Sequence, residues 1–213
     1  AQFRELMERV PHPGLAVSYK TLVNSEYNNM NHMLKNCYWL FNSDYDEDCF
    51  YGEEVEHSKD SMDITMINNS QWVYQSVNCN TCYQVYFSSD CEQSHDIWFS
   101  KNLVNCSNCF GCVNLKNQQY RIFNKQYVKD EYAKKLKEFN LGSSQAIQEF
   151  LRKSKEFGLQ FPHKYMHGRN NVNVSGDYIY HSKNVFNTYI ATESENCRYC
   201  MWLIVKPNRD CYD

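Results

Sequence analysis

The stretch Asn105-Cys106-Ser107-Asn108-Cys109-Phe110 places two cysteines directly after an asparagine, with one residue between the two pairs. Eight of the eleven cysteines in this 213-residue chain follow an Asn or Asp in this way. The other six pairs are Asn36-Cys37, Asp48-Cys49, Asn78-Cys79, Asp90-Cys91, Asn196-Cys197 and Asp210-Cys211. Most of the pairs precede a short aromatic and β-branched run. A turn residue, a small buried residue and a short strand, repeated along a chain, are typical of a β-solenoid.

The spacing of these runs predicts the fold class. From about Tyr27 to Gln126, short strand-forming runs alternate with polar turns such as Asn42-Ser43-Asp44. The runs start roughly 10–13 residues apart, so we expect two of them to form one rung of about 22–25 residues. The sequence therefore predicts a mostly β chain, a right-handed parallel β-helix (solenoid) with an inserted helical hairpin. An antiparallel sandwich is the alternative, but the Asn-Gly and Asp-Gly turns that favour hairpins are absent.

Two segments have helical periodicity. Near the N-terminus, apolar residues recur at helical spacing and Pro11-His12-Pro13-Gly14 should end the helix; they are Phe3, Leu6, Met7 and Val10. Within 128–160, two helices are expected, the second capped by Ser143 or Ser144 and ended by Gly158. Their apolar residues are Tyr132, Leu136, Phe139, Ile147, Phe150, Leu151 and Phe157.

We accordingly divide the chain into four segments. Residues 1–26 form an N-terminal helix and lead-in, and residues 27–127 form the solenoid rungs. Residues 128–160 form the helical insertion, which is expected to cover an open end or face of the coil, and residues 161–213 form further rungs. The chain neither begins with Met nor completes its last repeat at Asp213, so we expect a fragment or a processed form of a longer protein.

The cysteines offer one candidate metal site. Cys79-Asn80-Thr81-Cys82 and Cys106-Ser107-Asn108-Cys109 are Cys-x-x-Cys pairs, and structural zinc needs two such pairs around one ion. Cys79, Cys82, Cys106 and Cys109 are therefore the candidate zinc ligands. The favoured interpretation is a ladder of free cysteines that pack as small apolar residues in stacked rungs, with no cofactor. The odd number of cysteines favours a reducing, cytoplasmic location.

Other chemistry is less well supported by the sequence. His57-Ser58 and His95-Asp96 make a catalytic Cys-His dyad across rungs conceivable, yet scattered histidines and cysteines meet by chance. An acidic group in the first rungs suits a carbohydrate-active β-helix only if two or three carboxylates converge; it comprises Asp44, Asp46, Glu47, Asp48, Glu53, Glu54, Glu56 and Asp60. The net charge of −3 disfavours a protein that mainly neutralises phosphates, although the helical insertion is basic.

One segment carries a family resemblance. The stretch Asn108-Cys109-Phe110-Gly111-Cys112-Val113-Asn114-Leu115-Lys116-Asn117, with the later Asn124-Lys125-Gln126-Tyr127, resembles uncharacterised cysteine-rich repeat proteins predicted in candidate-phyla bacteria. The resemblance covers roughly 27–136. It implies Asn/Asp-Cys rungs and a helix after the Asn-Lys-Gln-Tyr motif, but no activity. Ser61 and Ser94 replace rung cysteines here, and Val128 replaces the usual Ser or Thr cap, which argues against metal in the rungs.

The sequence as a whole predicts a non-enzymatic repeat scaffold or binding module. Its flat face is expected to bind a protein or polymer partner through outward aromatic, Asn and acidic side chains. Two alternatives stay open, a zinc-stabilised nucleic-acid-associated domain and a carbohydrate-active β-helix enzyme. Nucleic acid is not favoured, no membrane span is expected, and self-association through the acidic rungs and basic helices stays open.

Overall fold

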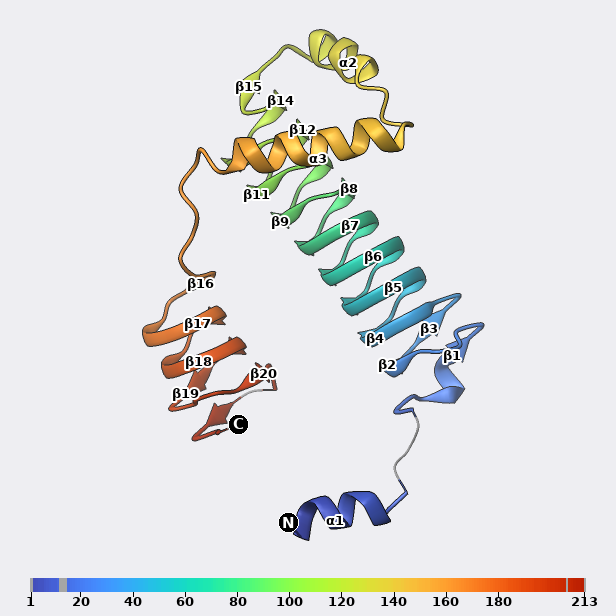
Figure 1. The fold of residues 1–213 in the computed structure, drawn as a ribbon, viewed down its shortest axis with the longest axis vertical. Coiled ribbons are helices and arrows are strands. Elements are labelled where there is room, and N and C mark those ends of the chain that lie inside the picture. Colours follow the sequence, from blue (N-terminus) through green and yellow to red (C-terminus); the bar gives the residue numbers. More distant parts are fainter. Residues whose placement is uncertain (1, 12–14, 206, 213) are drawn as a thin grey trace. The chain divides into compact units, whose positions relative to one another are not determined.

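The computed structural model describes residues 2–11, 15–205 and 207–212. The chain divides into two compact units, Ala1–Phe161 and Pro162–Asp213 (Figure 1). The helices are α1 (Gln2–Arg9), α2 (Lys129–Glu138) and α3 (Ser144–Gly158), with a 3-10 turn at Tyr19–Thr21. None of the described helices is both long enough and apolar enough to cross a membrane.

The first unit is a parallel β-helix, as expected from the sequence. Strand partners are separated by one constant interval of twelve positions, as in Cys49↔Ser61 and Ile97↔Cys109, and β14–β15 is the one antiparallel pair among the described strands. Its strands are β1 (Leu22–Val23), β2 (Asn29–His32), β3 (Leu34–Lys35), β4 (Tyr38–Asp44), β5 (Glu47–Glu56), β6 (Lys59–Asn68), β7 (Gln71–Asn80), β8 (Tyr83–Tyr86), β9 (Ser89–Glu92), β10 (His95–Trp98), β11 (Lys101–Val104), β12 (Ser107–Phe110), β13 (Val113–Lys116), β14 (Gln119–Ile122) and β15 (Lys125–Gln126). The antiparallel sandwich is thereby excluded. The right-handed sense of the coil stays a prediction.

One coil spans twelve positions of the chain, about half the length expected for a rung, so that expectation is wrong. The reason is a three-residue repeat: from Asn24 to Asn108 every third residue has a φ near +55°, within a range of 46° to 62°. Each such left-handed residue turns the chain and is followed by a buried residue, from Ser25 to Cys112. One coil therefore has four sides of three residues each. Asn and Asp tolerate this conformation better than most residues, which explains why they precede the buried cysteines.

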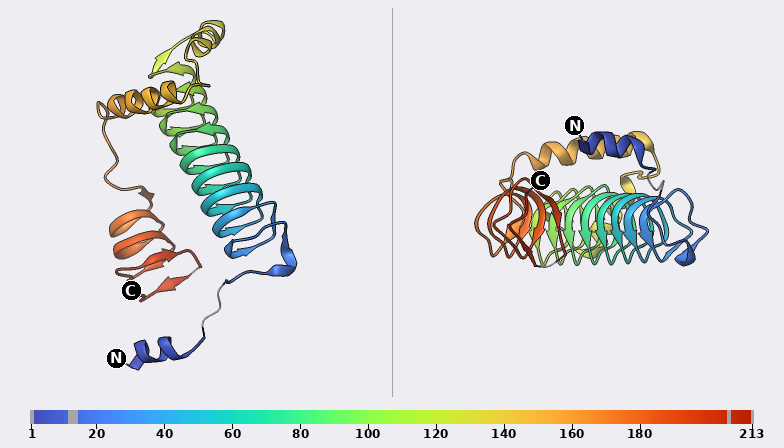
Figure 2. Two further views of the ribbon diagram at one scale, coloured as in Figure 1. Left: turned by 45° about the vertical axis from the view of Figure 1, so that its right-hand side comes forward. Right: turned by 90° about the horizontal axis from the view of Figure 1, so that it is seen from below.

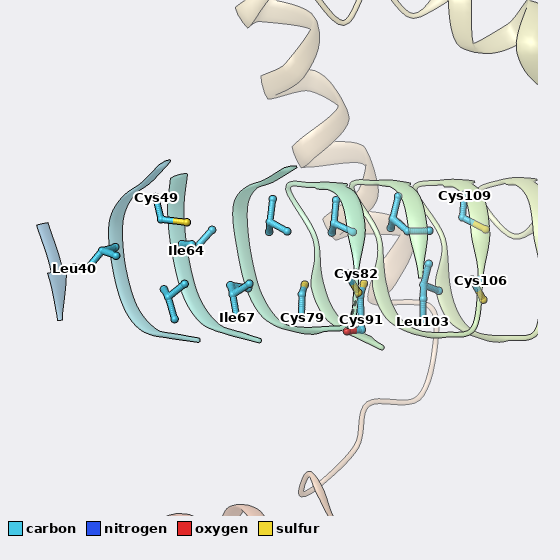
Figure 3. Packing of buried hydrophobic residues seen from close by; sticks show 14 of the residues in the cluster. Leu40, Cys49, Ile64, Ile67, Cys79, Cys82, Cys91, Leu103, Cys106 and Cys109 are labelled. Carbon is cyan, nitrogen blue, oxygen red and sulfur yellow. Dashed lines mark hydrogen bonds between the residues drawn. The ribbon is translucent and has the colours of Figure 1, made fainter. Parts of the chain in front are cut away.

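The interior is four columns of inward side chains, mostly Ser, Cys, Val, Leu and Ile. Figure 3 shows some of the apolar side chains, among them Leu40, Ile64 and Cys79. Inner serines bridge successive coils: the Ser88 hydroxyl donates to the Tyr86 carbonyl at 2.8 Å and accepts the Ser100 N–H at 3.0 Å. The Ser94 hydroxyl likewise donates to the Glu92 carbonyl and accepts the Cys106 N–H. A buried hydroxyl is stable here because both of its hydrogen-bonding roles are filled.

The second unit repeats the same design on a smaller scale (Figure 2). Its core contains Ile179, Val185, Ala191, Cys197 and Cys200. The strands are β16 (Gly168–Arg169), β17 (Val172–Tyr180), β18 (Lys183–Thr192), β19 (Ser194–Glu195), β20 (Met201–Leu203) and β21 (Asn208–Arg209). A bulge between Val174 and Gly176 changes the register, and a Cβ at Gly176 would lie 1.9 Å from the Thr188 carbonyl oxygen, so only glycine fits.

The helical segments lie close to where the sequence placed them. Helix α3 begins after Ser143, whose side chain makes no capping hydrogen bond, and ends at Gly158. Helix α2 begins after Val128, also without a side-chain cap. Of the segment expected to end the N-terminal helix, residues 12–14 lie outside the described residues. The helical hairpin belongs to the same unit as the first coils.

Candidate functional site

One side of the first β-helix carries two columns rich in aromatic side chains. Because residues one coil apart in the sequence stack on each other, two neighbouring outward positions each form a column. We name these two columns the aromatic stripe; the first holds Tyr38, Phe50, Met62, Tyr74, Tyr86, Trp98, Phe110 and Ile122, and the second holds Tyr27, Trp39, Tyr51, Asp63, Gln75, Phe87, Phe99, Gly111 and Phe123. Asp63 and Gln75 divide the rings of the second column into two runs. Neighbouring rings are in contact, with centroids 4.2 Å apart for Tyr86–Trp98 and 5.8 Å apart for Tyr38–Tyr51.

The helical hairpin covers the C-terminal half of this stripe. The Phe150 ring of α3 lies 4.9 Å from that of Phe110 and 5.9 Å from that of Phe99. Phe139, which follows α2, lies 4.7 Å from Phe110, and Phe157 lies 5.3 Å from Phe123. Phe110 is fully buried as a result. The helices therefore cover a face of the coil, one of the two positions expected for them.

No described helix covers the N-terminal half, which we call the open half; it consists of Tyr27, Tyr38, Trp39, Phe50 and Tyr51. Their exposed fractions are 64%, 37%, 50%, 37% and 48%. Trp39 and Tyr51 lie in edge contact with centroids 6.4 Å apart, so the rings form one surface. Exposed aromatic rings that lie together are a general feature of interaction surfaces, so the open half is the candidate site.

A shallow hollow borders the open half. It has a volume of about 260 Å³ and is lined by Trp39, Phe41, Tyr51, Gly52, Glu53, Asp63, Ile64 and Thr65. Gly52 occupies an inner position, and a Cβ there would lie 2.8 Å from Val55 Cγ2. Glu53 and Asp63 place two carboxylates beside the aromatic rings of the hollow.

The candidate zinc ligands are not brought together. Cys79 and Cys82 belong to one coil, and Cys106 lies further along the coil than Cys82 (Figure 3). The register places Cys106 two coils beyond Cys82 in the same column, with Ser94 between them. Coils about 4.8 Å apart separate the two pairs far beyond the zinc–sulfur bond length of about 2.3 Å. Among the described residues no group of three or more His, Cys, Asp or Glu could hold a metal ion. The four thiols therefore do not form the expected site.

The cysteines instead occupy inner packing positions. All eleven are free, and ten of them are buried. The Cys82 thiol donates to the Asn80 carbonyl at 3.4 Å, much as the inner serines do. Its hydrogen bond with Cys79 and its burial raise the pKa of Cys82, so this thiol stays protonated.

The wall of the coil separates the candidate histidines from the inward serine and cysteine side chains, whereas His95 pairs with Asp96 on the outside at 2.8 Å. His57 lies outside, stacked on Tyr45 at 4.6 Å, whereas Ser58 is buried inside and donates to the Glu56 carbonyl. Inward thiols and outward imidazoles therefore cannot form the suggested dyad in these coils. The acidic group is dispersed over several sides as well: Glu47 pairs with Lys35 and Lys59 in a ladder, and Asp46 is buried.

The basic residues of α3 have ordinary surface pairing. Lys153 pairs with Glu149, and Arg152 pairs with Glu156 at 2.6 Å, in both cases one helical turn apart. Their cations are therefore partly neutralised on the outer face of α3.

The sequence carries a pattern for the stripe that the expected rung of about 22–25 residues does not reveal. The aromatic pairs Tyr38-Trp39, Phe50-Tyr51, Tyr86-Phe87 and Trp98-Phe99 all recur at multiples of one interval. That interval is the length of one coil.

Comparison with known proteins identifies no family. No family model matches the chain, and no curated protein matches it. Among solved structures, a chain described as an acetyltransferase from Desulfovibrio desulfuricans G20 matches with 14% identity and a TM-score of 0.24, over 83% of this chain and 53% of that one. A UDP-N-acetylglucosamine acyltransferase from Campylobacter jejuni matches with 7% identity and a TM-score of 0.20, over 69% of this chain and 90% of that one. This chain thus spans about half the length of the first of these proteins.

Proposed function

We propose that this protein is a non-enzymatic binding scaffold whose open half engages a protein partner through an amphipathic helix. The observation that carries the proposal is that the same aromatic stripe already binds such a helix elsewhere in the chain. Helix α3 lays Phe150 on Phe99 and Phe110, and the open half presents the same two columns of rings without a described cover. Helix-in-groove recognition uses apolar anchors spaced in this way.

The chemistry of the rest of the coil supports a binding role. The inner positions are filled by packed side chains, and the outward carboxylates and histidines do not gather into a catalytic constellation among the described residues. Aromatic residues, by contrast, supply most of the energy of protein interfaces because they bury a large area with few rotatable bonds.

The test uses a labelled synthetic peptide with the sequence of residues 143–161. This peptide contains the sequence of α3, the helix that packs on the stripe within the chain. Fluorescence anisotropy should show saturable binding to the full-length chain, weakened at least tenfold by Trp39→Ala combined with Tyr51→Ala. Tyr45→Ala is the matched control, since Tyr45 is an exposed aromatic in the same coil as Trp39 but two sides away. Binding that is equal in all three proteins, or absent from the wild type, would contradict the proposal.

A carbohydrate-directed function is the second candidate, and the hollow is the observation in its favour. Trp39 offers a ring for stacking, and Glu53 and Asp63 offer carboxylates for hydroxyl groups. Calorimetry with a chitin and a cellulose oligosaccharide tests it. Binding that is lost in Glu53→Gln and Asp63→Asn, with no binding of the peptide, would favour this candidate over the first.

A further inference from the structure

We propose that helix α1 is the intrachain occupant of the open half, covering it as α3 covers the other half of the stripe. The inference deepens the proposed function, because it uses the same surface and names the helix that a partner must displace. Four observations support it. The apolar face of α1 is exposed, and α1 is about as long as the open half. The segment between α1 and the first coil is long enough to reach the open half, and the open half belongs to the same two columns on which α3 packs.

Helix α1 presents apolar side chains to solvent. Phe3 and Leu6 in the helix and Val10 directly after it recur at helical spacing and are 74%, 57% and 48% exposed. An isolated helix of eight residues is marginal in water, because nucleation is costly and few backbone hydrogen bonds form. A tertiary contact on this apolar face would stabilise the helix and remove the exposed side chains from water.

The dimensions of the two surfaces agree. Eight helical residues extend about 12 Å. Successive coils lie about 4.8 Å apart, so three coils present a surface about 10 Å long. The open half consists of three successive coils, which contribute Tyr27, then Tyr38 with Trp39, then Phe50 with Tyr51.

The chain is anchored beside this surface. The Ala16 N–H donates to Asn29 Oδ1 at 2.7 Å, and the Ser18 N–H donates to the Asn31 carbonyl at 3.2 Å. Asn29 lies two residues after Tyr27, on the next side of the same coil. Six residues separate Arg9 from Ala16, and an extended connection of that length reaches about 20 Å. The connection is therefore long enough for α1 to fold back over the open half.

The open half also belongs to the same two columns as an established interface. Phe150 and Phe157 of α3 pack on the C-terminal part of these columns, and two coils that carry Met62 with Asp63 and Tyr74 with Gln75 follow the open half. A tethered helix acts at an effective concentration in the millimolar range, so even a weak intrachain contact would be populated. A partner helix then binds by replacing α1, which makes α1 a gate to the scaffold.

Hydrogen–deuterium exchange of the full-length chain tests the proposal. We expect the amides of residues 6–10 to exchange at least tenfold more slowly in the wild type than in the Trp39→Ala, Tyr51→Ala double variant. The Tyr45→Ala control should keep the protection. Rapid exchange of these amides in the wild type, or protection that the double variant keeps, would overturn the proposal.

A second variant separates this inference from the proposed function. Phe3→Asp combined with Leu6→Asp alters only exposed side chains, and it should increase the affinity for the 143–161 peptide at least fivefold by freeing the open half. Protection of α1 in the wild type without peptide binding in this variant would remove the proposed function but keep the intrachain contact. If the variant and the wild type bind the peptide equally well and the amides of α1 exchange rapidly, the intrachain contact is removed and the proposed function is kept. Protection that rises with protein concentration, together with a dimer in sedimentation, would overturn the intrachain contact in favour of a second copy.

Discussion

At the scale of the residue, the coil depends on a repeated three-residue unit in which each position has its own requirement. The left-handed position favours Asn and Asp, and the inner position favours a small or β-branched side chain. Inner hydroxyls then relay hydrogen bonds between coils, as Ser76, Ser88 and Ser100 do in one column. This arrangement explains how a chain with only 7 Gly and 4 Pro can turn so often.

The relay predicts the cost of removing one hydroxyl. Ser88→Ala leaves the Ser100 N–H and the Tyr86 carbonyl without their buried partner, so the free energy of unfolding should fall by about 1–3 kcal/mol. Urea denaturation measures the change. Ser89→Ala, at the next and outward position, should change stability by less than about 0.5 kcal/mol. An equal loss in both variants would show that the relay contributes little.

The left-handed position predicts a stabilising substitution. Thr81 is exposed and has a φ of 55°, a conformation that a β-branched residue adopts at a cost. Thr81→Asn should raise the free energy of unfolding by about 1 kcal/mol. Thr65→Asn makes the same change at a position outside the left-handed set and should not stabilise the protein. If thermal melting gives the two variants the same shift, backbone conformation is not the cause.

Asp46 predicts a dependence of stability on pH. Desolvation of this buried side chain raises its pKa to about 8, although the Ser58 N–H donates to Oδ1 at 2.8 Å. An unfolded Asp has a pKa of about 3.9. Between these values the folded state keeps a proton that the unfolded state releases, so stability should fall as pH rises from about 4 to 8 and level off above that.

Asp46→Asn removes this titration. The variant should match the wild type near pH 4 and be more stable at pH 8 by roughly 2–5 kcal/mol, since each pKa unit corresponds to about 1.4 kcal/mol. Chemical denaturation at several pH values provides the measurement, with Asp48→Asn on the outside of the same coil as control. A difference between Asp46→Asn and wild type that does not change with pH would show that Asp46 is ionised in the folded protein.

At the scale of the element, the helical hairpin is held by a few rings rather than by capping. The side chains at the N-cap positions of α2 and α3, Val128 and Ser143, make no capping hydrogen bond, so packing has to provide the stability. Phe150 is central to this packing, because its ring contacts those of Phe99, Phe110 and Phe139.

Phe150→Ala should therefore lower the free energy of unfolding by about 2–4 kcal/mol and speed amide exchange throughout α3. Thermal unfolding and hydrogen exchange measure the two effects. Arg152→Ala, whose side chain is 62% exposed, should cost less than about 0.5 kcal/mol. Retention of slow exchange in α3 of the Phe150→Ala variant would show that the hairpin is held by other contacts.

At the scale of the whole molecule, the chain is built by stacking, and its cysteines are part of the stacked core. All eleven are free, and Cys211 is the only one that is not buried. Thiol titration of the reduced protein should show about one reactive thiol in the native state and eleven after unfolding, with or without a chelator. About four thiols that become reactive only after chelation would restore the zinc interpretation.

The sequence by itself determined the repeat, the β-solenoid class and the helical hairpin. These depend on local requirements: Asn and Asp at left-handed positions, small residues at inner positions, and apolar residues at helical spacing near Phe150. It also favoured free cysteines that pack as small apolar residues in stacked coils, and ten of the eleven free cysteines are buried.

The tertiary structure decided how long one coil is, and with it which side chains lie side by side. The point at which a coil closes depends on the left-handed backbone conformation at every third position. Residue types as varied as Trp39, Glu54 and Ile190 adopt this conformation, so the amino-acid composition does not specify it. That closure separates Cys82 from Cys106 and places His57 and Ser58 on opposite sides of the wall. It also aligns Tyr38, Phe50 and Phe110 in one stripe, because stacking brings residues one coil apart into contact regardless of what lies between them.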